Sequence, residues 1–206
     1  IYFRDEWVDR FDASLTKADT FHLANSTDVT CDFMNLVYSS NTFSKGDGYT
    51  RSALNLKSHG SMVFVLPDEG VDLQDLLSSP ASLHDLFEGG TQSNGKVTWK
   101  IPKFVCNSKL DLVDTLKKLG ITSAFEQDAD FSGITERQAF ISSIIQNTHI
   151  AIDEKGVEAS AFTKIDYAGA AMPVGQADMI LDRPFIYGIF SATSNLLFIG
   201  ICGNPR

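Results

Sequence analysis

The sequence predicts an α+β protein built mainly from antiparallel strands, and three observations carry this prediction. Apolar and alternating runs of the length and composition of β-strands recur along the 206 residues. Helical spacing, with apolar residues three or four positions apart, appears in fewer segments. Strand and helix signals do not follow the regular order that a doubly wound parallel sheet requires. We therefore expect several sheets, mostly antiparallel, with a minority of helices.

Four segments give the strand predictions. Residues 62–66 form an apolar run that is stopped by Pro67, as a buried strand would be. Residues 97–101 alternate apolar with polar side chains, which is typical of a half-buried antiparallel strand. The apolar runs 185–190 and 196–201 are separated by five small or polar residues, a pattern that predicts a hairpin.

Helices are predicted in three places. Segments 71–77, 82–87 and 110–119 each place apolar residues three or four apart, and Gly120 follows the last of them as a C-terminal stop. No change of composition divides the chain, so residues 1–206 are expected to belong to one domain.

Composition excludes several classes of function. The formal charge is 17 − 26 = −9 without a basic cluster, which argues against nucleic-acid binding. A membrane helix needs about 20 consecutive apolar residues, and no run approaches that length. Cys31, Cys106 and Cys202 lie far apart and have neither metal-site spacing nor the pattern of a disulfide framework.

The sequence also lacks the motifs of common enzymes. It contains no nucleophile elbow, no paired-histidine zinc motif and no phosphate-binding loop. The histidines occur singly, at His22, His59, His84 and His149. We therefore predict no catalytic residue, no metal site and no cofactor. One modification motif is present, the N-glycosylation sequon Asn25-Ser26-Thr27, which matters if the chain passes through a eukaryotic secretory route.

The most unusual segment covers residues 154–173. At period two from residue 157, one face carries Val157, Ala159, Ala161, Thr163, Ile165 and Tyr167, and the other carries Glu158, Ser160, Phe162, Lys164 and Asp166. That alternation is typical of a strand, but the small residues 168–171 that follow suit an exposed loop open to proteases. The segment is a candidate conformational switch; an ordinary strand followed by a surface loop is the alternative.

These residues resemble a known family. The run Glu154-Lys155-Gly156-Val157-Glu158-Ala159-Ser160-Ala161 looks like the hinge of the reactive-centre loop of the serpins. Further matches follow in family order: Tyr2-Phe3-Arg4-Asp5-Glu6-Trp7, Thr20-Phe21-His22, Phe64-Val65-Leu66-Pro67-Asp68-Glu69-Gly70, Ile101-Pro102-Lys103-Phe104, Leu119-Gly120-Ile121, Phe131-Ser132-Gly133-Ile134, Asp182-Arg183-Pro184-Phe185-Ile186 and Phe198-Ile199-Gly200. The resemblance therefore implies the serpin fold, with 154–173 as hinge and reactive-centre loop.

For this family the resemblance implies suicide inhibition of proteases. The target attacks a bait bond in the loop and becomes acylated, and the cleaved loop then inserts into the main sheet as a new strand. Family spacing from the hinge places the bait bond at Ala170-Ala171. A small residue before the bond suits the shallow pocket of elastase-like or subtilisin-like serine proteases. Trp7 matches the position where the loop enters the sheet.

The alternative is a non-inhibitory serpin that acts as a carrier or binding module, with the loop only a protease substrate. The hinge distinguishes the two, because non-inhibitory members tend to have bulky or charged residues where Ala159 and Ala161 stand. A hydrolytic enzyme is disfavoured, since no nucleophile constellation supports it.

The resemblance begins where about the second half of a serpin begins. We therefore expect residues 1–206 to be the C-terminal portion of a single serpin domain, with the N-terminal half as a missing partner. The alternative explanation of the amino end is a cloning boundary or an undetermined start. By itself the chain is expected neither to fold completely nor to inhibit, and exposed sheet edges would favour a strand-exchanged oligomer. Family resemblance alone favours an extracellular or secreted location.

Overall fold

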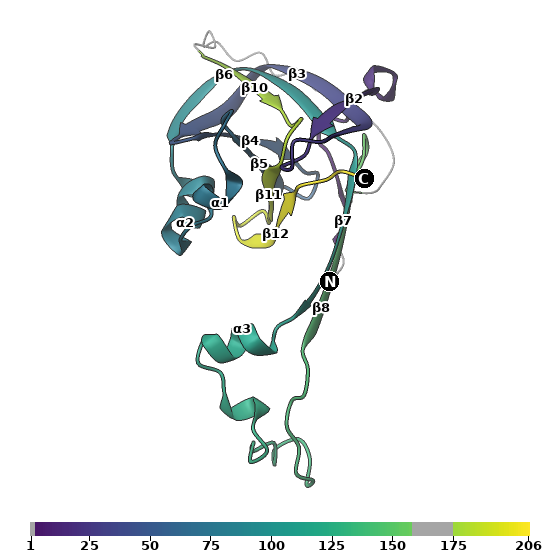
Figure 1. Ribbon diagram of the computed structural model, residues 1–206. Helices are drawn as coiled ribbons and strands as arrows, with labels where there is room; N and C mark the ends of the chain where they lie inside the picture. Colours follow the sequence, from purple (N-terminus) through teal and green to yellow (C-terminus); the bar gives the residue numbers. More distant parts are fainter. Residues whose placement is uncertain (1–2, 158–174) are drawn as a thin grey trace. The chain divides into compact units, whose positions relative to one another are not determined.

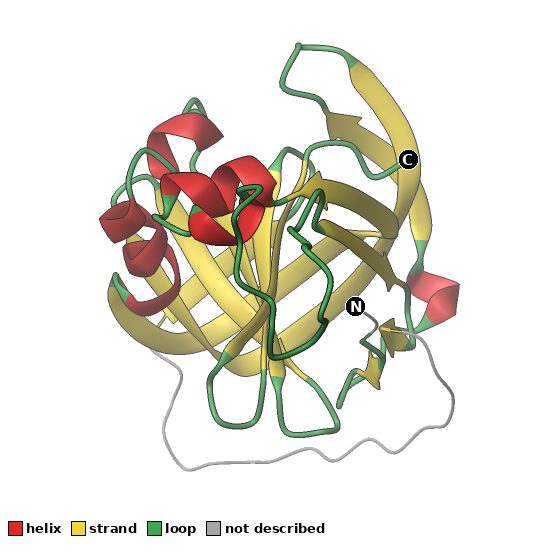
Figure 2. Ribbon diagram, turned by 90° about the horizontal axis from the view of Figure 1, so that it is seen from below, coloured by secondary structure: helices red, strands yellow, loops and turns green. Residues whose placement is uncertain are grey.

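The computed structural model describes residues 3–157 and 175–206, and the chain forms two compact units. The larger unit comprises Phe3–Val105 and Ala151–Arg206, and the smaller one contains Cys106–Ile150. Strands are the predominant element and helices are few (Figure 2). The expected α+β class is therefore confirmed.

The larger unit is organised around one large sheet, in which neighbouring strands follow the order β10-β6-β3-β4-β5-β11-β12 and β2 also pairs with β3 (Figure 1). Its strands are β2 (Lys17–His22), β3 (Asp28–Gly46), β4 (Tyr49–Asn55), β5 (Ser61–Pro67), β6 (Thr91–Pro102), β10 (Gly175–Ile180), β11 (Phe185–Phe190) and β12 (Leu196–Cys202). Among the described residues every pair in this sheet is antiparallel except β10 with β6.

The strand predictions are confirmed in this sheet. Residues 62–66 lie in β5, and 97–101 lie in β6, where alternate residues from Val97 to Ile101 are buried. The hairpin predicted from 185–190 and 196–201 is formed by β11 and β12, with Phe185 opposite Cys202. Alternation marks 97–101 because one face of β6 is buried there, whereas 62–66 and 185–190 are continuous apolar runs because both faces of β5 and β11 are largely buried.

The core of the larger unit contains a cluster of aromatic side chains and a second cluster that the helices cover. Phe64 contacts Trp99 edge-on, with ring centroids 5.6 Å apart, and packs against Phe185 at 6.1 Å. Helices α1 (Leu73–Leu76) and α2 (Pro80–Glu88) place their leucines on a buried cluster of Tyr49, Val65, Leu86 and Ile186. Ser79 begins α2, because its side chain accepts a hydrogen bond from the Ser82 N–H at 3.0 Å. The helices predicted at 71–77 and 82–87 are both present, the first shortened to residues 73–76 and the second extended to residues 80–88.

The helix predicted at 110–119 is shorter than expected. Residues 110 and 111 belong to β7 (Phe104–Asp111), and α3 spans only Val113–Lys118. Strand β7 pairs with β8 (Ile145–Ile152), and the Leu112 N–H still donates to the Ile144 carbonyl at 2.9 Å. Pairing with a distant strand therefore overrides the local helical spacing until residue 112.

The smaller unit contains α3 and the 3-10 turn η2 (Ser123–Phe125). Gly120 ends α3 with a φ of +92°, and the Ile121 N–H donates back to the Leu116 carbonyl at 3.0 Å. The predicted C-terminal stop at Gly120 is confirmed, since glycine adopts this left-handed conformation without strain. Within the described ranges no helix has the length and apolar character to span a bilayer.

Candidate functional site

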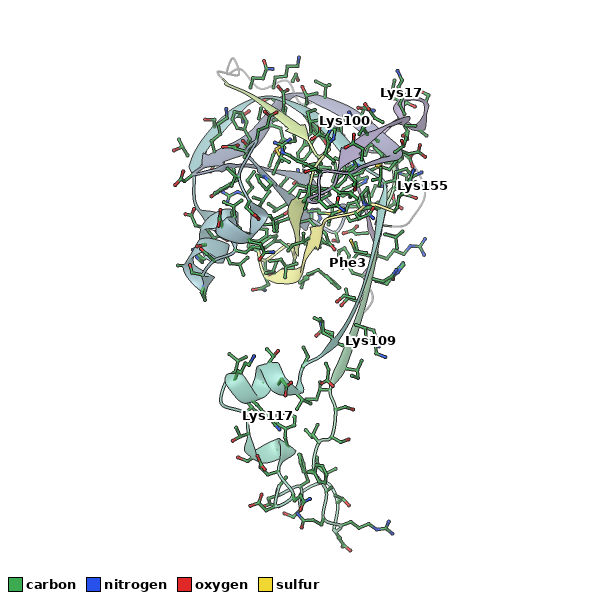
Figure 3. The ribbon with its side chains drawn as sticks, viewed as in Figure 1. Phe3, Lys17, Lys100, Lys109, Lys117 and Lys155 are labelled. Carbon is green, nitrogen blue, oxygen red and sulfur yellow. The ribbon has the colours of Figure 1, made fainter. Side chains whose placement is uncertain are left out.

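The candidate site is a tight turn in the larger unit, where the chain leaves β8 and enters the predicted hinge. Asp153 and Gly156 exchange backbone hydrogen bonds in both directions, each 3.2 Å long. The Asp153 carboxylate also accepts from the Lys155 N–H at 2.8 Å. An aspartate at the first position stabilises such a turn by bonding the backbone two residues ahead. Lys155, at the tip, is exposed at the periphery of this unit (Figure 3).

Gly156 is required by the geometry of the turn. Its φ is +135°, and a Cβ at this position would lie 2.5 Å from the Glu6 Cα and 2.7 Å from the Trp7 N. After the turn, β9 (Gly156–Val157) pairs antiparallel with β1 (Asp5–Glu6), with Gly156 opposite Glu6. The absence of a side chain lets the two backbones approach closely. The start of the predicted hinge is therefore held against β1.

Trp7 holds the same turn from the next position after β1. Its side chain is fully buried, and its indole N–H donates to the Asp153 carbonyl at 2.9 Å. Its backbone N–H donates to the Lys155 carbonyl at 3.2 Å. Phe11 packs edge-on against the indole, with ring centroids 6.3 Å apart, and its own N–H donates to the Glu154 carbonyl at 3.1 Å. Three successive carbonyls of the turn thus accept from Trp7 and Phe11.

The Glu154 side chain contacts Thr16 and Lys103, and we call these three residues the hinge clasp. The Thr16 hydroxyl donates to the Glu154 carboxylate at 2.8 Å, and the Lys103 ammonium lies 3.0 Å from its other oxygen. Burial raises the pKa of this carboxyl, but hydrogen bonds from the backbone, Lys103 and Thr16 outweigh burial, so the pKa lies below its ordinary value. The carboxylate is therefore held in its charged form.

The partners in the clasp come from distant parts of the chain. Thr16 follows the 3-10 turn η1 (Ala13–Leu15), and its N–H closes that turn on the Ala13 carbonyl at 3.2 Å. Lys103 joins β6 to β7, and its N–H donates to the Asp32 carbonyl of β3 at 2.8 Å. The clasp thus ties the hinge to the large sheet.

A second charged group secures β1 itself. The Glu6 carboxylate pairs with Arg10 at 2.7 Å and with Lys57. Hydrogen bonds from Lys57, and then from Arg10, hold the pKa of Glu6 below its ordinary value. The Lys57 N–H also donates to the Glu6 carbonyl at 2.9 Å, so β1 is held by its backbone as well as by the Glu6 side chain.

The contacts at this turn position the backbone that leads into β9. In the part of the chain that the structure describes, no three His, Cys, Asp or Glu side chains are grouped to hold a metal ion. The contacts fix the position of Gly156 and Val157, beside β1 and next to Asp153 at the end of β8.

The structure brings together five of the residues singled out in the sequence: Trp7, Glu154, Lys155, Gly156 and Val157. The remaining hinge residues, Glu158, Ala159, Ser160 and Ala161, and both residues of the predicted bait bond, Ala170 and Ala171, lie outside the described residues.

The sequence did not identify Asp153, Lys103 and Thr16 as parts of the site. Lys103 stands in one of the quoted family matches, Ile101-Pro102-Lys103-Phe104, which was the available signal for it. Asp153 directly precedes the hinge and has the residue type that favours a turn. Thr16 gave no signal.

Comparison with known proteins identifies the type of fold. The sequence profile of the family described as "Serpin (serine protease inhibitor)" matches residues 1–205. A "Serine protease inhibitor" from Cyanea capillata is 31% identical over 230 residues, covering 100% of this chain and 55% of that protein.

Two solved structures extend the comparison. The thermophilic protein tengpin, in its native state, superimposes with a TM-score of 0.77 and 28% identity, covering 95% of this chain and 52% of that one. Human thyroxine-binding globulin, solved with its ligand, gives a TM-score of 0.82 and 27% identity, covering 100% of this chain and 55% of that one. The chain therefore spans about half the length of the proteins that it matches.

Proposed function

The chain belongs to the serpin family, and from that membership we propose that it forms the part of a suicide inhibitor that carries the reactive-centre loop. Serpins are mostly protease inhibitors rather than catalysts. The target protease would attack the loop and become acylated, and the cleaved loop would then insert into the main sheet as an added strand.

The observation that carries this proposal is the fixed hinge at Gly156. The backbones of β9 and β1 meet in register there, with Trp7 and the hinge clasp on either side. A strand that is to be inserted needs a defined starting point, because a shift of one residue would turn every side chain to the opposite face. The turn at residues 153–156 supplies that starting point.

The composition after Gly156 supports insertion. Ala159 and Ala161 share one face of the alternating segment with Val157. Small side chains on that face would enter between neighbouring strands without a steric clash, and insertion would add ladder hydrogen bonds and bury that face. The uninserted state would persist because its barrier is high, which makes it kinetically rather than thermodynamically stable.

We place the bait bond between Ala170 and Ala171. The small residue before the bond favours elastase-like or subtilisin-like serine proteases, whose specificity pockets are shallow. Trypsin-like enzymes are disfavoured, since neither alanine carries a positive charge.

The active inhibitor would include the half of the domain that this chain does not match. An apolar face of β12 supports this proposal, since Leu197, Ile199 and Ile201 are each 45% exposed while Phe198 and Cys202 on the opposite face are buried. A contiguous exposed apolar row is typical of a surface that another segment covers. A second copy of the chain, pairing by strand exchange, is the alternative occupant of this face.

A carrier or binding module is the second candidate function. It is favoured by the likeness to human thyroxine-binding globulin, a protein solved in complex with thyroxine. In that case the loop would be cut by proteases without trapping them.

The two functions are separated by incubating the full-length protein with pancreatic elastase. The inhibitor predicts a covalent complex that survives denaturing electrophoresis, with mass spectrometry locating the acyl bond at Ala170. Elastase whose active-site serine has been blocked is the control and should give no complex. Clean cleavage of the loop without a complex would overturn the inhibitor proposal in favour of the carrier.

A further inference from the structure

The hairpin between β2 and β3 carries the sequon Asn25-Ser26-Thr27, which the protease-inhibitor function does not use. Strand β2 ends at His22 and β3 begins at Asp28, so the sequon occupies the connection between two paired strands. Residues 24–27 are all exposed. A sequon accepts a glycan without harm to the fold only where the finished structure leaves its asparagine in solvent.

The connection is held in one conformation. The Leu23 N–H donates to the Thr27 carbonyl at 2.8 Å, and the Ser26 N–H donates to the Leu23 carbonyl at 3.0 Å. At the base, His22 and Asp28 face each other in register and their side chains are 2.8 Å apart. The acceptor asparagine is thus presented at the tip of a closed hairpin rather than within a strand.

The side chains of the sequon are aligned with one another. The Asn25 carbonyl oxygen Oδ1 accepts from the Thr27 backbone N–H at 3.1 Å and from the Thr27 hydroxyl at 2.6 Å. The backbone N–H can only donate, so it fixes which end of the amide is the oxygen. The amide nitrogen Nδ2 therefore points away from these bonds, and it has no hydrogen-bond partner among the described residues.

A second asparagine in a strand connection shows the contrast. Asn195 lies between β11 and β12 and is also exposed, but its Nδ2 donates to the Thr193 hydroxyl at 2.9 Å. It is followed by Leu196 and Leu197, so no hydroxyl stands two positions ahead. Asn25 combines exposure, a hydroxyl at the second position and a free amide nitrogen, whereas Asn195 has the exposure alone.

From this geometry we propose that Asn25 is an acceptor for N-linked glycosylation in a eukaryotic secretory pathway. The donor is a lipid-diphosphate-linked oligosaccharide. Nδ2 forms a bond to the anomeric carbon of the first sugar, and the bond from that carbon to the diphosphate oxygen breaks. The lipid diphosphate leaves with the bonding electron pair, and Nδ2 loses one proton to a base.

The test is to secrete the full-length protein from insect or mammalian cells and map its glycans by mass spectrometry. The expected result is a glycan on the peptide that contains Asn25, removed by peptide N-glycosidase with conversion of the asparagine to aspartate. N25Q and T27A should each abolish the modification, T27S should retain it, and N195Q, the matched control, should leave it unchanged.

The wild-type peptide alone decides the question if a variant fails to be secreted. An unmodified Asn25 peptide in the secreted protein, beside a co-secreted reference protein that is glycosylated, would overturn the proposal. A glycan that persists in T27A would overturn it as well, because the modification would then be independent of the sequon.

Discussion

Replacing Gly156 by alanine tests whether the hinge depends on the close approach of β9 to β1. The new Cβ would lie 2.5 Å from the Glu6 Cα, 2.7 Å from the Asp5 carbonyl oxygen and 2.7 Å from the Trp7 N. All three atoms belong to the backbone, so no side chain can rotate away to make room. The φ of +135° adds strain that alanine cannot relieve locally.

The expected cost follows from two contributions. Holding a non-glycine residue at a sparsely populated φ costs about 1–3 kcal/mol. Moving β9 away from β1 weakens two backbone hydrogen bonds, from the Trp7 N–H to the Lys155 carbonyl and from the Phe11 N–H to the Glu154 carbonyl, at about 1 kcal/mol each. Alanine offsets about 0.4–1 kcal/mol of this cost, because it lowers the conformational entropy of the unfolded chain. The net loss at the hinge is about 3 kcal/mol.

Hydrogen exchange of the Trp7 amide in the full-length protein measures this loss, because that proton exchanges when the hinge opens locally. A loss of about 3 kcal/mol corresponds to exchange about a hundredfold faster. Gly70→Ala is the control for conformational strain without a steric clash, because Gly70 has a φ of +81° and open space around it. Gly203→Ala, with open space and no left-handed φ, should change neither its local exchange nor that of Trp7. Exchange at Trp7 that stays within about threefold of wild type in Gly156→Ala would refute the reasoning.

The remaining predictions concern the hinge clasp, the tryptophan and the loop. Because the pKa of Glu154 is depressed in the folded state, the carboxylate stabilises the fold above its unfolded pKa, and this stabilisation is lost as pH falls through the folded pKa. The difference in unfolding free energy between wild type and Glu154→Gln should therefore shrink on acidification. A difference that does not change with pH would contradict this. Trp7→Phe removes the indole bond to the Asp153 carbonyl and should cost about 1 kcal/mol in urea unfolding, whereas an unchanged midpoint would mean the bond contributes nothing. Ala161→Arg should convert inhibitor into substrate, seen on denaturing gels as cleaved protein in place of complex, and undiminished complex would argue against insertion of that face. Ala170→Arg should shift inhibition from elastase to trypsin in rate assays, and retained elastase preference would move the bait bond elsewhere.

Much of the fold could be predicted from the sequence where a strand buries one face, which gives alternation, or both faces, which gives a continuous apolar run. The alternation at residues 97–101 and the paired runs 185–190 and 196–201 gave β6 and the β11–β12 hairpin. The helix at 110–119 was predicted too long, because its spacing is helical but its first residues pair with β8. The local sequence pattern does not predict the pairing of β7 with β8, because β8 lies more than thirty residues away in the sequence.

The site was predictable where its residues are contiguous and not where they are distant. The run from Glu154 to Val157 was identified by its likeness to the serpin hinge, and the structure places Trp7 against it. The clasp joins Glu154 to Lys103 across 51 positions and to Thr16 across 138. Nothing in the spacing of single charged or hydroxyl residues indicates that they meet, because only the fold brings η1 and the end of β6 to the turn.

The most direct test of loop insertion at this hinge compares the stability of the full-length protein before and after cleavage within residues 158–174. A protease that cuts the loop but does not remain bound should be used, and unfolding followed by heat and by urea. If the loop inserts from Gly156 as a new strand, the cleaved protein should unfold at a markedly higher temperature and urea concentration, because ladder hydrogen bonds and apolar burial are gained. Cleaved protein that unfolds at the same temperature and urea concentration as the intact protein would contradict insertion.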